Sequence, residues 1–360
     1  MGLIRIILAC FVVIYHCGQF ENFKMMQGPE AVQSFYIISG FYMALILNEK
    51  YHLQVNSYRL FVTNRLLKLM PIYWFMVLLI ILVSLVTFLK SDGNNLAFFQ
   101  SFKNQTFSFG SFIYLILSNI FIVGQDFALF MGFNSGNGHL FFTSFYDKST
   151  PPVYSFMLVP QAWTISIEIM FYIIAPFFVR KKIWVIALLA CISLGIKFIL
   201  HQNGLVYDPW SYRFFPAELF FFLLGVLSYK LYVKTKKITI PKWVLLCCFG
   251  TTLCVIIAFN TLLLQFHHYV YFICFSFVIP FIFRVTQKNK WDRLIGDYSY
   301  PIYITHVFFK SLYYMVFGYS LNVSIPVIIA SILFALVYNQ FINKRLERFR
   351  QKRVLIGNLN

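Results

Sequence analysis

Apolar runs about as long as a membrane-crossing helix recur along the whole chain, and they constrain its fold more than any other feature. A helix needs about 20 predominantly apolar residues to cross the hydrocarbon core of a bilayer. The 360 residues are 60% hydrophobic and only 12% charged, whereas soluble domains carry about 25% charged residues. The sequence therefore predicts an all-α, polytopic integral membrane protein. The runs lie near 3–20, 31–48, 72–89, 112–131, 163–179, 183–200, 215–232, 243–263, 268–285, 299–317 and 325–342.

The basic residues predict how the chain is oriented in the membrane. A net charge of +18 would suggest a nucleic-acid partner in a soluble protein. Here Lys and Arg fall in short connectors between apolar runs, which is the pattern that marks cytoplasmic loops. We therefore expect the lipid bilayer, and no nucleic acid, as a partner. The basic segments lie within 49–71, 180–182, 230–242, 284–293 and 344–353.

The same charges predict the number of membrane crossings. Between the cytoplasmic segments at 49–71 and 180–182 the chain must cross an even number of times, yet three apolar runs lie there. The run at 112–131 is interrupted by five polar or glycine residues, including Asp126, so we predict that it does not span. About ten transmembrane helices plus one re-entrant or interfacial segment result, with both termini cytoplasmic. The predicted outside segments are 90–111, 132–162 and short turns near 201–214, 264–267 and 318–324.

The first apolar run, RIILACFVVIYH, begins with Arg5 and ends with His16. Eleven residues at about 100° each come to roughly three full turns, so these two side chains share one helix face, about 16 Å apart along the axis. Ionisable residues inside a span are costly and usually face a bundle interior or a pathway. Glu168 lies at a similar predicted depth to His16, and a carboxylate there would orient the imidazole as a general base.

A second group of polar residues is predicted near the cytoplasmic surface. Arg65 and Lys68 are three residues apart, so they share a helix face, and with Arg5 they would form a phosphate site. Simpler interpretations are that these cations only set the topology, that His16 is a buried histidine bonded to a neighbouring helix, and that Glu218 is an interfacial anchor. The residues alone fit either an enzyme or a transporter.

Six motifs in order resemble the membrane-bound acyltransferase 3 family of bacterial cell-surface glycan O-acyltransferases. Single motifs of this kind are weak, but six in sequence are specific. The family's arginine and histidine with ten residues between them match Arg5 and His16, and Lys68 stands where a second arginine is usual. Thr164 replaces a usual serine, whereas Ser166 and Glu168 are retained. The motifs are GLIRIILACFVVIYH, VQSFYIISGFYMALIL, FVTNRLLKLMPIYW, AWTISIEIMFYIIAPF, FFPAELFFFLLGVL and LIGDYSYPIYITHV.

The resemblance implies a bacterial inner-membrane enzyme that moves an acyl group, acetyl in particular, from cytoplasmic acetyl-CoA to a glycan or lipid-linked saccharide. It implies His16 as general base or transient acyl carrier, Glu168 as its orienter, and Arg5 as a residue that binds the donor or stabilises charge. Ser39, Ser166, Tyr300 and His306 are second-tier candidates. No metal is expected, because the seven cysteines show no ligand spacing. The alternatives are a polysaccharide exporter or flippase and a structural subunit of a polysaccharide synthase.

The predicted domain organisation is one acyltransferase 3-like transmembrane domain over 1–343, followed by a basic cytoplasmic tail over 344–360. We expect no hydrolase-like extracytoplasmic domain of the kind fused to some family members.

Overall fold

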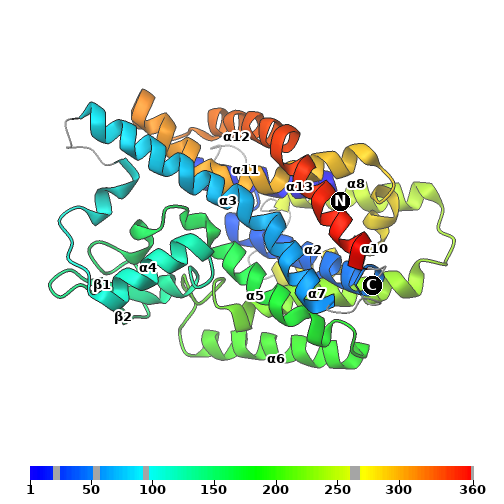
Figure 1. Ribbon diagram of the computed structural model, residues 1–360. Coiled ribbons are helices and arrows are strands. Elements are labelled where there is room, and N and C mark those ends of the chain that lie inside the picture. The colour runs from blue at the N-terminus through cyan, green and yellow to red at the C-terminus, as the bar shows by residue number, and fades with distance from the viewer. Residues whose placement is uncertain (19–24, 52–56, 92–96, 260–267, 358–360) are drawn as a thin grey trace. The chain divides into compact units, whose positions relative to one another are not determined.

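The computed structural model describes residues 1–18, 25–51, 57–91, 97–259 and 268–357. Within these ranges the chain forms two compact units, and Figure 1 labels their helices and strands. The predicted turn near 264–267 lies outside the described residues. Unit 1 comprises Met1–Asn64, Phe171–Ile196 and Pro216–Asn360, and unit 2 comprises Arg65–Met170 and Lys197–Phe215.

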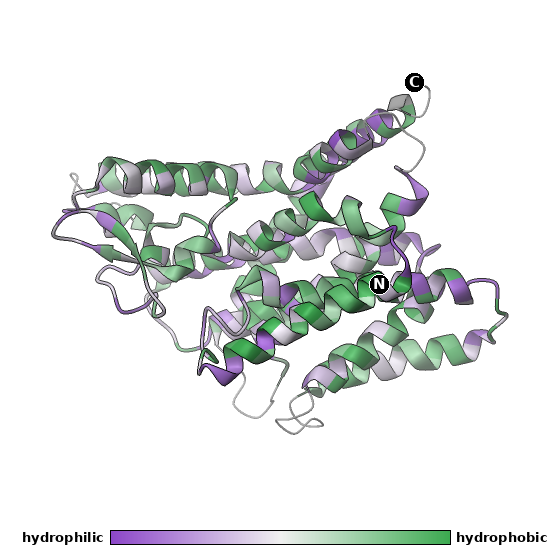
Figure 2. Cartoon of the chain, turned by 90° about the horizontal axis from the view of Figure 1, so that it is seen from below, coloured by the Kyte–Doolittle hydropathy of each residue, from purple (hydrophilic) through white to green (hydrophobic). Residues whose placement is uncertain are grey.

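In the described residues each apolar run that the sequence marks contains an α-helix, although the helix in the run at 112–131 ends at Phe121. Among the described residues, seven helical segments are long and apolar enough to cross a membrane, and Figure 2 shows hydrophobic residues along most of the helices. This confirms the all-α polytopic fold. The α-helices are α1 (Gly2–Cys17), α2 (Gly28–Glu49), α3 (Ser57–Lys90), α4 (Phe109–Phe121), α5 (Trp163–Phe178), α6 (Ile183–Gln202), α7 (Phe215–Thr235), α8 (Lys242–Ile257), α10 (His268–Thr286), α11 (Lys290–Phe317), α12 (Ser324–Tyr338) and α13 (Lys344–Gly357).

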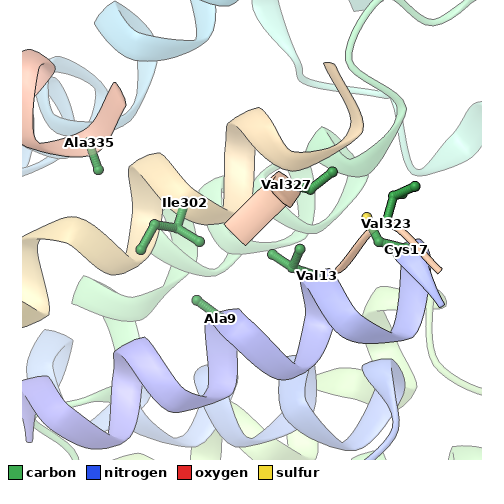
Figure 3. Packing of buried hydrophobic residues seen from close by; sticks show 7 residues of the cluster. All are labelled: Ala9, Val13, Cys17, Ile302, Val323, Val327 and Ala335. Carbon is green, nitrogen blue, oxygen red and sulfur yellow. The ribbon is translucent and has the colours of Figure 1, made fainter. Parts of the chain in front are cut away.

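Helices α1 and α11 run in parallel at the centre of unit 1. At their N-terminal ends the backbones almost touch, because a Cβ built on Gly2 would lie 1.6 Å from the Asp292 carbonyl oxygen. Further along, Ala9 and Val13 point toward Ile302 across the seam (Figure 3). Small residues permit this close approach, as they do in many membrane helix pairs.

Two glycines let α2 and α7 pack backbone against backbone. A Cβ on Gly40 would lie 2.0 Å from the Phe222 carbonyl oxygen, and a Cβ on Gly225 would lie 2.0 Å from the Ile37 carbonyl oxygen. Both glycines belong to motifs singled out in the sequence. Gly40 and Gly225 therefore permit the close packing of α2 against α7.

Unit 2 contains the segment that was predicted not to span. Its helix α4 has 13 residues, about 20 Å in length, which is shorter than the roughly 30 Å hydrocarbon core. The chain then turns through Ile122, which has φ of 65°, a conformation rare for a β-branched residue. The length of α4 agrees with the prediction of a re-entrant or interfacial segment.

The long loop after α4 has a small core of its own, which its composition did not predict. Strands β1 (Met131–Asn134) and β2 (His139–Phe142) pair antiparallel, with Met131 opposite Phe142. Phe133 and Phe156 are buried together with Leu115 of α4. The segment predicted to lie outside, 132–162, thus contributes to a small hydrophobic core within unit 2.

The basic tail is helical and docked. A five-residue π-helical stretch, Asn339–Asn343, joins α12 to α13. From α13, Arg350 donates to the Asn64 carbonyl oxygen at 2.9 Å, and Arg353 donates to the Asn64 side chain at 2.8 Å. The tail therefore anchors the first turns of α3 within unit 1.

Candidate functional site

The C-terminal end of α1 is fixed by α11 and by the start of α12. The last carbonyl groups of a helix lack partners within the helix, and here three successive ones, at 16–18, are satisfied from outside. Lys310 of α11 donates to the first at 2.5 Å, Val323 donates its backbone N–H to the second at 2.8 Å, and the Ser324 hydroxyl donates to the third. The backbone beneath His16 is therefore held rigidly, although its side chain is exposed.

A second histidine lies beside His16. The ring centroids of His16 and His306 are 5.2 Å apart, with an interplanar angle of 31°. His306 is fully buried, and its Nδ1 lies 2.5 Å from the Tyr303 carbonyl oxygen. An exposed imidazole beside a buried one can take a proton from a substrate hydroxyl and pass it on, which is the chemistry of a general base.

The opposite end of the same α1 face carries Arg5. A Cβ built on Gly296 of α11 would lie 3.5 Å from Arg5 Nη1, so the guanidinium packs beside α11. His16 contacts the same helix through His306. The prediction that Arg5 and His16 share one face is confirmed, and that face looks at α11.

The other two predicted donor-binding cations lie on α3 in unit 2. Arg65 and Lys68 are both half-buried, and the helix continues through them although the sequence suggested a connector there. Arg65 Nε is buried and has no hydrogen-bond partner among the described residues. A buried, unpaired guanidinium donor suits a phosphate oxygen. Their grouping with Arg5, which belongs to unit 1, stays a prediction.

Glu168 is half-buried on α5 and belongs to unit 2, whereas His16 belongs to unit 1. Its predicted pairing with His16 therefore stays a prediction. Two residues earlier, Ser166 donates to Asp126 Oδ1 at 2.6 Å and accepts the backbone N–H of Gly124 at 3.1 Å. Burial raises the pKa of Asp126 to about 6, and the bond from Ser166 opposes that rise. Ser166 thus ties α5 to the strained turn after α4.

The tryptophan at the start of α5 contacts a half-buried ion pair. The Arg213 guanidinium carbon lies 4.2 Å from the centroid of the Trp163 ring, a cation–π contact. Its Nη2 donates to Asp208 Oδ2 at 2.7 Å, and the Tyr146 hydroxyl donates to the same oxygen at 3.0 Å. Burial and the Asp208 carboxylate raise the pKa of Tyr146 to about 12. Trp163 and Tyr146 therefore both contact this ion pair within unit 2.

The remaining candidates from the sequence have different surroundings. Ser39 Oγ lies 3.4 Å from the Tyr172 hydroxyl within unit 1, and Tyr300 is half-buried on α11. The interfacial-anchor interpretation of Glu218 is wrong, because this side chain is 0% exposed and accepts from Gln33 Nε2 at 3.1 Å. A position near the end of an apolar run does not tell which neighbours cover it.

Sequence reasoning did not assign roles to several residues that lie beside the His16–His306 pair or in the polar clusters of unit 2. Lys310 holds the His16 carbonyl, and Tyr303 accepts from His306. In unit 2, the buried Asp126 and the half-buried Arg213 are charged groups with polar partners. The sequence did mark Asp126, because a carboxylate inside an apolar run is unusual. We used it only to predict that the run at 112–131 does not span the membrane.

Comparison with known proteins identifies the family. A family model described as an acyltransferase domain matches residues 1–340. The chain belongs to the acyltransferase 3 family. It is accordingly a membrane acyltransferase, and the resemblance drawn from six motifs is confirmed. No curated protein and no solved structure matches the chain. Within the family domain, the Arg5–His16 face and the histidine of the last motif meet on α1 and α11.

Proposed function

We propose that this protein is an integral membrane O-acyltransferase. It transfers an acyl group, acetyl in particular, from a cytoplasmic acyl-CoA to a hydroxyl of an exported glycan or lipid-linked saccharide. The observation that carries the proposal is the exposed His16 ring held beside the buried His306 ring. Membership of the acyltransferase 3 family supports the reaction class and a bacterial inner-membrane location, and the basic connectors support cytoplasmic placement of both termini.

The reaction follows from the chemistry of the two substrates. The acceptor hydroxyl has a pKa far above neutral, so it needs to lose its proton as it attacks the thioester carbon. His16 takes that proton while the new C–O bond forms. The C–S bond then breaks, and the coenzyme A thiolate recovers the proton from the His16 imidazolium. General-base help of this kind is typically worth about 10²–10⁴ in rate.

The donor is proposed to bind through cations. Coenzyme A carries several phosphate groups, and Arg65 offers a buried Nε that has no partner among the described residues. Lys68 lies one turn further along α3 and adds a second positive charge. Arg5 would bind the donor or stabilise charge at the thioester. Glu168 is proposed as a further residue that assists the base.

The test is the surface glycan of a strain carrying His16→Ala. Its quantity and its ester content are measured by mass spectrometry, at matched expression and membrane insertion. We expect normal quantity without ester, and a smaller loss in Glu168→Gln. His201→Ala is the matched control, because His201 is also an exposed histidine in the last turn of an apolar helix, and its ester content should equal that of the wild type.

Two outcomes would contradict the proposal. Normal ester content in His16→Ala would remove the base from the mechanism. Glycan that fails to reach the surface at all would indicate an exporter instead.

A further inference from the structure

The buried histidine of α11 has a defined protonation state. A carbonyl oxygen only accepts hydrogen bonds, so His306 Nδ1 must donate to the Tyr303 carbonyl oxygen, 2.5 Å away. In a neutral ring, this leaves an unprotonated Nε2 with its lone pair directed outward. That nitrogen is buried and has no hydrogen-bond partner among the described residues. Burying an acceptor without a partner is costly, so a donor is expected to reach it.

His16 lies at the distance from which a donor could reach this nitrogen. Ring nitrogens lie about 1.1 Å from the ring centroid, so centroids 5.2 Å apart bring two facing nitrogens to about 3 Å, a normal hydrogen-bond length. His306 is enclosed by protein, whereas the His16 ring is exposed and can turn to complete the bond.

The other groups around the pair are already engaged or neutral. The Lys310 ammonium of α11 donates a hydrogen bond to the His16 carbonyl oxygen. From α1, Tyr15 meets the His16 ring edge-on and Cys17 is a buried thiol. From α12, Ser324 donates to the backbone at the end of α1. The ring of Tyr303 lies 5.8 Å from that of His306.

We propose that His306 is a positioning residue for acyl transfer, whose Nε2 accepts the N–H of His16. This bond fixes the tautomer of the exposed ring, so that the other His16 nitrogen presents its lone pair to the acceptor hydroxyl. When the hydroxyl proton moves to His16, the resulting imidazolium donates more strongly to Nε2. His306 itself stays neutral and keeps its proton on Nδ1. The inference rests on the proposed function and gives His306 the orienting role that the sequence suggested for Glu168.

The test compares three substitutions in the purified full-length protein, reconstituted with acyl-CoA and a glycan acceptor. His306→Leu keeps bulk but removes the acceptor. His306→Gln places an amide oxygen near the position of Nε2, and His306→Asn places its amide near Nδ1 instead. A hydrogen bond to a charged group corresponds to about a 10- to 150-fold effect. We therefore expect kcat to fall by about that factor in the Leu and Asn variants, with both KM values nearly unchanged and with most of the rate restored in Gln.

The pH profile separates positioning from a structural role. A bond that stabilises the His16 imidazolium by that factor favours the protonated ring, so its loss moves the ascending limb of kcat/KM to lower pH by about 1–2 units. A merely structural role would lower activity without moving this limb. An unmoved limb in His306→Leu, or a Gln variant as slow as Leu, would overturn the proposal. If His306→Leu does not fold, the comparison of His306→Gln with His306→Asn tests the proposal instead. A Gln variant as slow as the Asn variant would then overturn it.

A measurement without turnover keeps this inference distinct from the proposed function. The protein is labelled with ¹⁵N-histidine, and the His16 signals are assigned by their loss in His16→Gln. We expect the His16 titration to move to lower pH in His306→Leu. Absence of acyl transfer by the wild type would refute the proposed function, whereas an unchanged His16 titration would refute the His16–His306 bond.

Discussion

Replacing Gly40 by alanine tests the close packing of α2 against α7. The added Cβ would lie 2.0 Å from the Phe222 carbonyl oxygen, whereas ordinary contacts lie at 3.4–4 Å. The two backbones must therefore separate by about 1.4 Å, the difference between 3.4 and 2.0 Å. The obstructing atoms are backbone, so no flexible side chain can move aside. Overpacking of this kind typically costs about 1–3 kcal/mol and occasionally more.

Helix propensity also contributes to the change in the free energy of unfolding, and a matched glycine-to-alanine variant isolates this contribution. Alanine is favoured over glycine in a helix by about 1 kcal/mol, so part of the clash is offset. A Cβ added to Gly195 of α6 would have no described atom within 4 Å, so Gly195→Ala should show only the favourable part. We expect Gly40→Ala to lower the free energy of unfolding by up to about 2 kcal/mol net and Gly195→Ala to raise it by up to about 1 kcal/mol, so that the two variants differ by about 1–3 kcal/mol.

The assay is thermal unfolding of the purified protein in detergent. The measured quantity is the fraction of protein that remains monodisperse after heating. Gly225→Ala should behave like Gly40→Ala, because its Cβ would lie 2.0 Å from the Ile37 carbonyl oxygen in the same seam. The double variant should lose less than the sum of the two, because one displacement of α7 relieves both clashes. A Gly40→Ala protein as stable as Gly195→Ala would refute the backbone contact.

Three further predictions concern other parts of the chain. The pKa of Asp126 in the folded protein, about 6, lies above the ordinary 3.8, so the free energy of unfolding should fall by up to about 3 kcal/mol as pH rises from about 4 to 6. Asp126→Asn should flatten that slope in detergent unfolding, and an unchanged slope would exclude this carboxyl as its cause. Arg65→Ala should weaken coenzyme A binding by about 10- to 150-fold in calorimetry, while Arg59→Ala, an exposed cation on the same helix, should not; equal binding in both variants would reduce Arg65 to a topogenic charge. In a cysteine-free background, a cysteine within 132–162 should react with an impermeant reagent from outside and one within 233–240 should not; labelling of the second site in intact cells would reverse the orientation.

Local periodicity made the relations within one element predictable. Arg5 and His16 share a face because 11 residues complete about three turns of any α-helix, and no neighbouring segment is needed to establish this. The apolar runs likewise predicted most of the helices, and the run with five polar or glycine residues contains a helix, α4, of only 13 residues. The order of six motifs predicted the family, which the match over 1–340 confirms.

Tertiary structure decided which faces meet. Depth along a helix placed Glu168 in the layer of His16, but depth carries no information about azimuth or about which helices are neighbours. Those are set by close contacts such as Gly2 against α11, which bring His306 to His16. For the same physical reason Glu218 looked like an interfacial residue in the sequence and is buried against Gln33 in the fold.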